Sequence, residues 1–190
     1  MRIIAGRLGG RRIHAPAGRD TRPTTDRVRE AVFNVLAHAE WAPPLAGARV
    51  LDLFAGSGAL GLEAASRGAA FVLFMETDTA ARASIRRNIE TLGLGGITKL
   101  WRRDATRPGH ASPMPPFDLA FLDPPWGQGL AEKALAALRA GGWLKADAVA
   151  VVEESTRSDF VPPEGFLLLE HRDYGDARIH FLKNVPLLGT

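Results

Sequence analysis

The segment LDLFAGSGALG, residues 51–61, decides the class of fold. Its start belongs to the apolar run 48–54, which predicts a buried strand, and its end opens a helical pattern. Between the two lies a G-x-G-x-x-G motif formed by Gly56, Gly58 and Gly61. This motif is informative where it follows a strand and opens a helix, which is its context here. Because glycine lets the backbone turn tightly and approach a ligand closely, the segment predicts a ligand-binding loop after the first strand of an α/β sheet.

Apolar runs and helical patterns alternate along the rest of the chain. Further strands are expected at 69–76, 98–104, 117–123 and 148–155. Helices are expected at 58–68, in 79–94 with Gly93 as a stop signal, and from 130 to a close at Gly141-Gly142. The segment 166–183 predicts two more strands joined around 174–176. Strands separated by helices form a mostly parallel sheet with helices on both faces, and a terminal hairpin makes the last strand antiparallel. We therefore expect an α/β fold with a mostly parallel seven-stranded sheet and a C-terminal β-hairpin.

Acidic residues stand at the ends of four predicted strands: Asp52, Glu76, Asp104 and Asp123. A single acid at such a position is usually a helix cap or a turn residue. Four acids on one rim indicate a site instead, because open α/β sheets bind ligands at the carboxyl ends of their strands.

The positions of these acids indicate the kind of ligand. Glu76 is spaced to hydrogen-bond a pair of ribose hydroxyls, and Asp104 is placed to accept from an adenine amino group. This predicts an adenosine-containing cofactor, either a dinucleotide or S-adenosylmethionine. Asp52 favours the second, because a carboxylate there can hold a ligand ammonium and would sit awkwardly beside a pyrophosphate.

The segment FLDPPWGQG, residues 121–129, ends a strand in a rigid turn. Consecutive prolines disfavour helical backbone and lack an N–H, so the Asp123 carboxylate and the Pro124 carbonyl become acceptors at a fixed separation. Two such acceptors suit an exocyclic amino group, which offers two donors. Trp126 offers a flat face on which an extruded base can stack. The alternative is a proline-rich turn with the tryptophan packed in the core.

The N-terminal part of the chain is strongly basic. Residues 1–29 hold eight arginines and two aspartates, a net charge of +6 in a chain of net charge +3. A basic arm suits phosphate backbones, and RIIAGRLGGRRIHAP (2–16) predicts a small β-hairpin with arginine on one face. We predict that this arm contacts the phosphates of a nucleic acid through Arg7, Arg11 and Arg12, with a solvated tail as the alternative. The expected division is a basic extension, 1–21, and a single domain, 22–190.

The composition excludes several classes of site. The sequence has no cysteine, which excludes disulfides, thiolate metal sites and cysteine nucleophiles. Its five histidines show no ligand spacing, so no metal is predicted. No stretch reads as a signal peptide or a membrane span, and we expect a cytoplasmic monomer with no membrane partner.

The motifs DLFAGSG, ETD and DPPW resemble those of S-adenosylmethionine-dependent amino-group methyltransferases. RPTTDRVREAVFNVL (22–36), together with DLFAGSGALGLEAASRG (52–68), resembles RsmD-type 16S ribosomal RNA (guanine-N2) methyltransferases, and the similarity covers most of the chain. The resemblance implies a Rossmann-like methyltransferase fold in which Asp123, Pro124 and Trp126 hold the target amine. It also implies a pocket for S-adenosylmethionine lined by Asp52, Phe54, Ala55, Gly56, Ser57, Gly58, Glu76, Thr77, Asp104 and Ala105.

The activity implied by this resemblance is methyl transfer to the N2 amine of a guanine in small-subunit ribosomal RNA, free or in the assembled subunit. Thr24, Thr25 or Asp26 can cap the helix that RPTTDRVRE opens, and we expect Arg22 and Thr24 beside the incoming RNA. The alternatives are an amino-methyltransferase for another RNA or for DNA adenine and, further away, an NAD-dependent oxidoreductase or a non-catalytic RNA chaperone.

Overall fold

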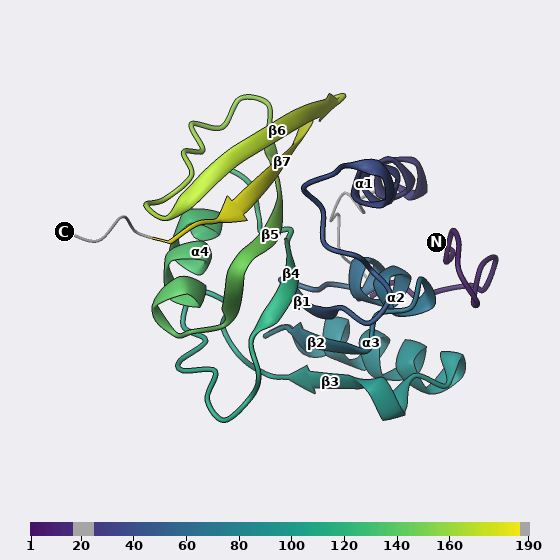
Figure 1. Ribbon diagram of the computed structural model, residues 1–190. Coiled ribbons are helices and arrows are strands. Elements are labelled where there is room, and N and C mark those ends of the chain that lie inside the picture. Colours follow the sequence, from purple (N-terminus) through teal and green to yellow (C-terminus); the bar gives the residue numbers. More distant parts are fainter. Residues whose placement is uncertain (17–24, 187–190) are drawn as a thin grey trace.

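The computed structural model describes residues 1–16 and 25–186. Seven strands in these ranges form one sheet in the order β3-β2-β1-β4-β5-β7-β6 (Figure 1). β7 is antiparallel to both of its neighbours, and the other pairings are parallel, as the terminal hairpin predicted. The strands are β1 (Arg49–Leu53), β2 (Phe71–Met75), β3 (Thr98–Trp101), β4 (Phe117–Leu122), β5 (Leu144–Ser155), β6 (Phe166–Tyr174) and β7 (Ala177–Asn184).

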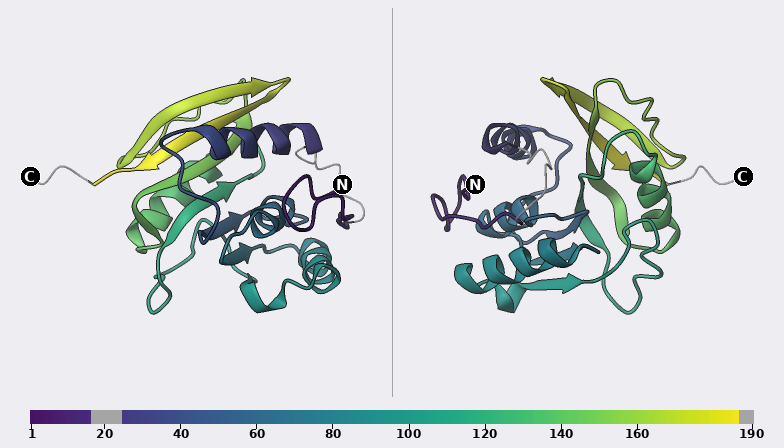
Figure 2. Two further views of the ribbon diagram at one scale, coloured as in Figure 1. Left: turned by 45° about the vertical axis from the view of Figure 1, so that its right-hand side comes forward. Right: turned by 180° about the vertical axis from the view of Figure 1, so that it is seen from behind.

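Helices cover the two faces of the sheet unequally. The helices are α1 (Asp26–His38), α2 (Ala59–Ser66), α3 (Thr79–Leu92) and α4 (Leu130–Ala140), with a 3-10 turn η1 (Gly95–Ile97). The first three lie on one face and α4 lies on the other (Figures 1 and 2). Side chains alternate along each strand, so Val50 packs in the core under α2 and Leu51 in the core under α4.

The first helix begins where the sequence predicted. Thr25 is its N-cap, and its side-chain oxygen accepts a hydrogen bond of 3.2 Å from the backbone N–H of Val28. Val32 and Leu36 are buried in the core. None of the helices in the described ranges is long and apolar enough to cross a membrane.

Two strands differ from the expected boundaries by three residues or more. β3 ends at Trp101, three residues before the predicted end, and β5 begins at Leu144, four residues before the predicted start. Leu144 pairs with Phe117, after which Asp147 takes a positive φ of 64° and the register shifts. The early part of β5 is polar and exposed, so hydrophobic patterning did not detect it.

The N-terminal arm reverses direction as the predicted small hairpin, with one antiparallel bridge between Arg2 and Arg12. Backbone hydrogen bonds join its two sides: Ile3 N–H donates to the Arg11 carbonyl at 2.9 Å, and Ile13 N–H donates to the Met1 carbonyl at 3.0 Å. The amide groups of Ile4 and Ala5 donate to the carboxylate of Glu63, at 2.8 and 3.0 Å. The short hairpin is therefore attached to α2 by side-chain hydrogen bonds.

Candidate active site

A cavity of about 750 Å³ opens at the carboxyl ends of the central strands, a volume typical of small-molecule sites. It brings together residues that are far apart in the sequence. The three predicted catalytic residues line it: Asp123, Pro124 and Trp126. So do nine of the predicted cofactor residues: Asp52, Phe54, Ala55, Gly56, Ser57, Glu76, Thr77, Asp104 and Ala105.

The loop after β1 has a backbone conformation that few residues adopt. Phe54 has a φ of 55° and Gly56 a φ of 58°, both in the left-handed region. A Cβ on Gly56 would meet only the Phe54 carbonyl oxygen, at 4.0 Å, so backbone conformation is what requires glycine there. A non-glycine residue at positive φ is costly and clusters at functional sites, which fits the place of Phe54 on the cavity wall.

Gly58 is not among the residues that line the cavity, although we predicted a cofactor contact for it. It is the N-cap of α2, and a Cβ there would lie 3.2 Å from Phe74 Cε1 and 3.3 Å from Ile85 Cγ1. A Cβ on Gly61 would press against the Phe74 ring as well. The glycines of the motif therefore differ in role: Gly56 lines the cavity, Gly61 lets α2 pack closely on the sheet, and Gly58, with a φ of 79°, meets both a backbone and a packing requirement.

Asp52 forms the inner wall of the cavity and is only 2% exposed. Its Oδ2 accepts a hydrogen bond of 2.9 Å from the backbone N–H of Gly61. Burial raises the pKa of Asp52 to about 8; the Gly61 hydrogen bond opposes this shift, and the charge of Glu76 adds to it. A cationic group beside Asp52 would restore its charged form, so the site suits the ammonium predicted for this position.

Glu76 joins the glycine loop to the end of β2. Its Oε2 accepts from the backbone N–H of Gly56 at 2.8 Å, and its Oε1 accepts from that of Asp78 at 2.9 Å. Each carboxylate oxygen has two acceptor positions, so Glu76 can also accept from ribose hydroxyls. The residue that holds the loop is thus also the predicted ribose ligand.

Asp104 lies on the exposed edge of the cavity, after β3. Its Oδ1 accepts from the hydroxyl of Thr106 at 2.7 Å and from its backbone N–H at 2.8 Å. These two hydrogen bonds lower the pKa of Asp104, which remains a charged acceptor at neutral pH. The adjacent Ala105 is buried against the same wall.

The turn that follows β4 is held from behind. Pro124 is buried, whereas Asp123 and Trp126 are half-buried at the cavity. The backbone N–H of Gly127 donates to Oε2 of Glu154 at 3.1 Å, and Glu154 is only 1% exposed. A buried carboxylate on β5 therefore fixes the end of the Asp-Pro-Pro-Trp turn.

A fifth acid on the rim, Glu153, was missed by the sequence analysis. It lies near the end of β5, is 8% exposed and lines the cavity. The run AVAVVEES carries the same signal as the other four positions, an acid where an apolar strand ends. No group of three or more His, Asp or Glu side chains within residues 1–16 and 25–186 could hold a metal ion.

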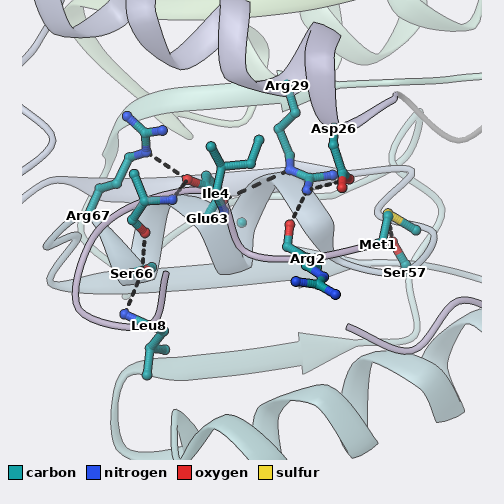
Figure 3. Close-up of polar contacts among 12 residues, drawn as sticks. Met1, Arg2, Ile4, Leu8, Asp26, Arg29, Ser57, Glu63, Ser66 and Arg67 are labelled. Carbon is teal, nitrogen blue, oxygen red and sulfur yellow. Dashed lines mark hydrogen bonds and ion pairs between the residues drawn. The ribbon is translucent and has the colours of Figure 1, made fainter. Parts of the chain in front are cut away.

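The N-terminal arm is docked beside the cavity through Glu63 and Ser66 of α2 (Figure 3). Glu63 accepts from the arm and from Arg67 Nε, at 2.8 Å, and the Ser66 hydroxyl accepts from the backbone N–H of Leu8 at 3.0 Å. Met1 lines the cavity, with its sulfur 3.9 Å from the Ser57 hydroxyl. The arm is thus part of the structure that surrounds the glycine loop.

Arg29 was counted with the basic arm, and its placement corrects that interpretation. Its side chain is fully buried, donates to Asp26 at 2.9 Å and to the backbone carbonyl of Arg2, and lies 3.9 Å from Glu63 (Figure 3). This arginine joins α1 to the arm and to α2, so it cannot contact a phosphate at the surface.

The other predicted RNA contacts divide into two groups. Arg7, Arg11 and Arg12 are exposed on the arm, while the apolar side chains between them are buried, as a one-faced basic hairpin predicts. Arg11 also donates to the backbone carbonyl of Thr91 at 3.0 Å. The predicted positions Arg22 and Thr24 lie outside the described residues.

Comparisons with known proteins agree with this arrangement. The family model described as conserved hypothetical protein 95 matches residues 1–183. Ribosomal RNA small subunit methyltransferase D of Escherichia coli is 39% identical over 158 residues, which cover 83% of this chain and 76% of that protein. The protein of the same name from Haemophilus influenzae is 35% identical over 186 residues, 97% of this chain and 94% of that protein.

Solved structures have the same architecture. A protein from Escherichia coli, provisionally named a methyltransferase, superposes with a TM-score of 0.82 at 34% identity and covers 98% of this chain and 99% of its own. A protein of Thermus thermophilus, named only as hypothetical, gives a TM-score of 0.75 at 30% identity, over 95% of this chain and 98% of its own. The fold is therefore a Rossmann-like methyltransferase fold. Because the family model spans almost the whole sequence, the chain belongs to the conserved hypothetical protein 95 family, the RsmD family of methyltransferases.

Proposed function

We propose that this protein transfers a methyl group from S-adenosylmethionine to the exocyclic N2 amine of a guanine in small-subunit ribosomal RNA. One observation carries the proposal. The predicted cofactor residues and the Asp123–Trp126 turn, which are contributed by different strands, line a single cavity. The names of the relatives, ribosomal RNA small subunit methyltransferase D, support the choice of substrate.

The charges of the cavity fit this cofactor. S-adenosylmethionine carries a sulfonium and an ammonium group. Five carboxylate side chains line the cavity: Asp52, Glu76, Asp104, Asp123 and Glu153. The buried Asp52 would face the ammonium, Glu76 the ribose, and Asp104 the adenine amino group. The pyrophosphate of a dinucleotide would be repelled by the same acids, which disfavours the oxidoreductase alternative.

The cofactor supplies an electrophilic methyl group, and the protein must present a nitrogen to it. The lone pair of a guanine N2 is delocalised into the ring, which makes it a weak nucleophile. Accepting its two N–H groups at the Asp123 carboxylate and the Pro124 carbonyl would draw the nitrogen towards tetrahedral geometry and aim the lone pair. Positioning of this kind can supply an effective molarity of about 10⁵ M or more.

Two further side chains complete the proposed role of the turn. Trp126 would stack on the extruded base and hold its plane. After transfer the nitrogen must lose a proton. Asp123, which would already hold that amine, is the nearest candidate acceptor, with water as the alternative.

The arm residues Arg7, Arg11 and Arg12 would hold the RNA backbone outside the cavity, because contacts to phosphates position a nucleic acid without specifying its sequence. We also propose that the protein acts in the cytoplasm as a monomer.

The decisive experiment is a methyl-transfer assay on small-subunit RNA and on small subunits from a strain that lacks this modification. Mass mapping of the product should place one methyl group on the N2 of a single guanine. Methylation of adenine, or of a ring carbon, would contradict the proposed chemistry. The absence of transfer to either substrate would contradict the proposed RNA.

A further inference from the structure

A second hollow, of about 560 Å³, lies on the α4 side of the sheet beside the edge strand β3. The connection from β3 to β4 has no helix, and it runs on the same side of the sheet as α4 in all views (Figures 1 and 2). We call this hollow the β3 groove. It is lined by Arg49, Phe71, Lys99, Trp101, Arg103, His110, Ala111, Ser112, Pro113, Met114 and Pro115.

Cationic and aromatic side chains are interleaved in the β3 groove. The Arg103 guanidinium lies 4.4 Å from the ring centre of Trp101, and that of Arg49 lies 4.7 Å from the ring centre of Phe71. Arg49 lies 4.7 Å from the Phe117 ring as well, so rings contact it twice, whereas the exposed Arg103 is stacked on one ring. An exposed, stacked arginine presents a flat outer face, a feature that binds unstacked bases in single-stranded RNA.

The charge of the β3 groove has one sign. No acidic side chain is among its described lining residues. Three basic side chains and a histidine are: Arg49, Lys99, Arg103 and His110. Asp118, the carboxylate that interacts electrostatically with Arg49, is paired with Lys145 at 2.7 Å. Lys99 and His110 are exposed. A surface of this charge attracts phosphate groups.

Arg103 connects the β3 groove with the active-site cavity, because it lines both. On one side of it stand the acids of the cavity, and on the other the basic wall of the groove. A strand whose target base enters the cavity must keep its phosphates away from the acids. The groove offers the adjoining place where the flanking nucleotides can lie.

We propose that the β3 groove binds the single-stranded RNA next to the target guanine, with Lys99 and His110 at the phosphates and the Arg103–Trp101 stack against a flanking base. This proposal rests on the proposed function, since it concerns the RNA that enters the active site. It assigns the groove a part in holding substrate and no part in cofactor binding.

The test compares two substitutions on the walls of the groove, the charge reversal Lys99→Glu and the added negative charge of His110→Glu, with a matched reversal at Arg172. Arg172 lies in β6, at the opposite edge of the sheet, in an exposed pair with Glu170, which contributes little to stability. For a protein-free fragment of small-subunit RNA, Lys99→Glu should raise the dissociation constant about three- to tenfold, and its salt slope should flatten by about 0.7 for each phosphate that is no longer neutralised. Arg172→Glu should leave both values unchanged, and all three variants should bind S-adenosylhomocysteine like the parent protein.

Each other outcome has a definite meaning. An unchanged salt slope in both groove variants would overturn the proposal. Weaker binding to assembled subunits, with unchanged binding to protein-free RNA, would also overturn it and would indicate an acidic protein partner. A parent protein that binds RNA through the groove but transfers no methyl group would contradict the proposed function and leave the groove in place, because the binding assay does not depend on catalysis.

Discussion

The active-site cavity and the β3 groove adjoin at Arg103 but differ in charge. The cavity is built from strand ends that each contribute an acid, whereas the groove is built from arginine, lysine and aromatic side chains beside an edge strand. A cationic cofactor and an uncharged base suit the first, and a phosphate backbone suits the second. Under the two proposals, the cavity would carry out the chemistry on one base and the groove would bind the strand that carries it.

The largest effect is expected at Trp126, which belongs to the cavity. Trp126→Ala should lower single-turnover methyl transfer about 100-fold, because a base that loses its stacking face is misplaced by about an ångström. RNA affinity and its salt slope should change little. Trp126→Phe is the matched control and should recover most of the rate. A comparable loss of RNA affinity in Trp126→Ala would show that the cavity also binds the RNA strand, and it would contradict the separation of the two roles.

Glu76 gives the next largest effect, on the cofactor alone. Glu76→Ala should weaken S-adenosylmethionine binding by about 1–3 kcal/mol, the scale of charge-assisted hydrogen bonds. The affinity of Glu76→Gln should lie between those of the parent protein and Glu76→Ala, because one side-chain oxygen can still accept a hydrogen bond. Calorimetric titration measures both variants. Unchanged affinity in a folded Glu76→Ala protein would remove Glu76 from the cofactor site.

The pKa of Asp52, about 8, predicts a pH dependence of cofactor binding. The ligand ammonium favours the charged carboxylate, so below pH 8 binding must release a proton from Asp52. Affinity should therefore fall by up to about tenfold for each unit by which the pH is lowered below 8. Titrations with S-adenosylhomocysteine in buffers of different ionisation enthalpy count that proton. Asp52→Asn should bind more weakly and without this pH dependence.

The same carboxyl affects stability in the opposite direction. Its pKa in the folded protein lies above the unfolded value of 3.8, so the folded state keeps a proton that the unfolded state releases. The contribution of Asp52 to stability is therefore present below about pH 4 and declines as the pH rises towards 8. Denaturant unfolding of Asp52→Asn should lack this decline. An identical pH profile in both proteins would place the shifted pKa elsewhere.

The smallest effect is expected at the arm. Replacing Arg7, Arg11 and Arg12 with alanine should weaken binding of every RNA sequence alike and flatten the salt slope by up to about 0.7 for each single-strand phosphate that is released. Affinity for S-adenosylhomocysteine should remain unchanged. Combined with Lys99→Glu, the effects should add if the arm and the β3 groove hold different phosphates. An unchanged slope in the triple variant would make the arm a purely structural element.

Local sequence determined the parts of this protein that depend on neighbouring residues. Strands and helices follow hydrophobic spacing, and the strand-to-loop position of the glycine motif places Gly56 at the ligand surface. Acids at strand ends meet on one rim because parallel strands end on the same edge of a sheet. Most of the candidate site could therefore be predicted from the sequence, and Glu153 could have been predicted by the same rule.

Only the tertiary structure decided what each polar residue pairs with. Arg29 reads as one more arginine in a basic arm, yet it is buried beside Glu63, whose carboxylate attaches the N-terminal arm to α2. Phe74 and Ile85 bound the space beside Gly58, a packing constraint that the glycine motif alone does not indicate. The β3 groove joins the start of β1, the start of β2 and the loop before β4. Contacts of this kind join residues distant in sequence, and the periodicity of one segment carries no information about which other segment packs against it.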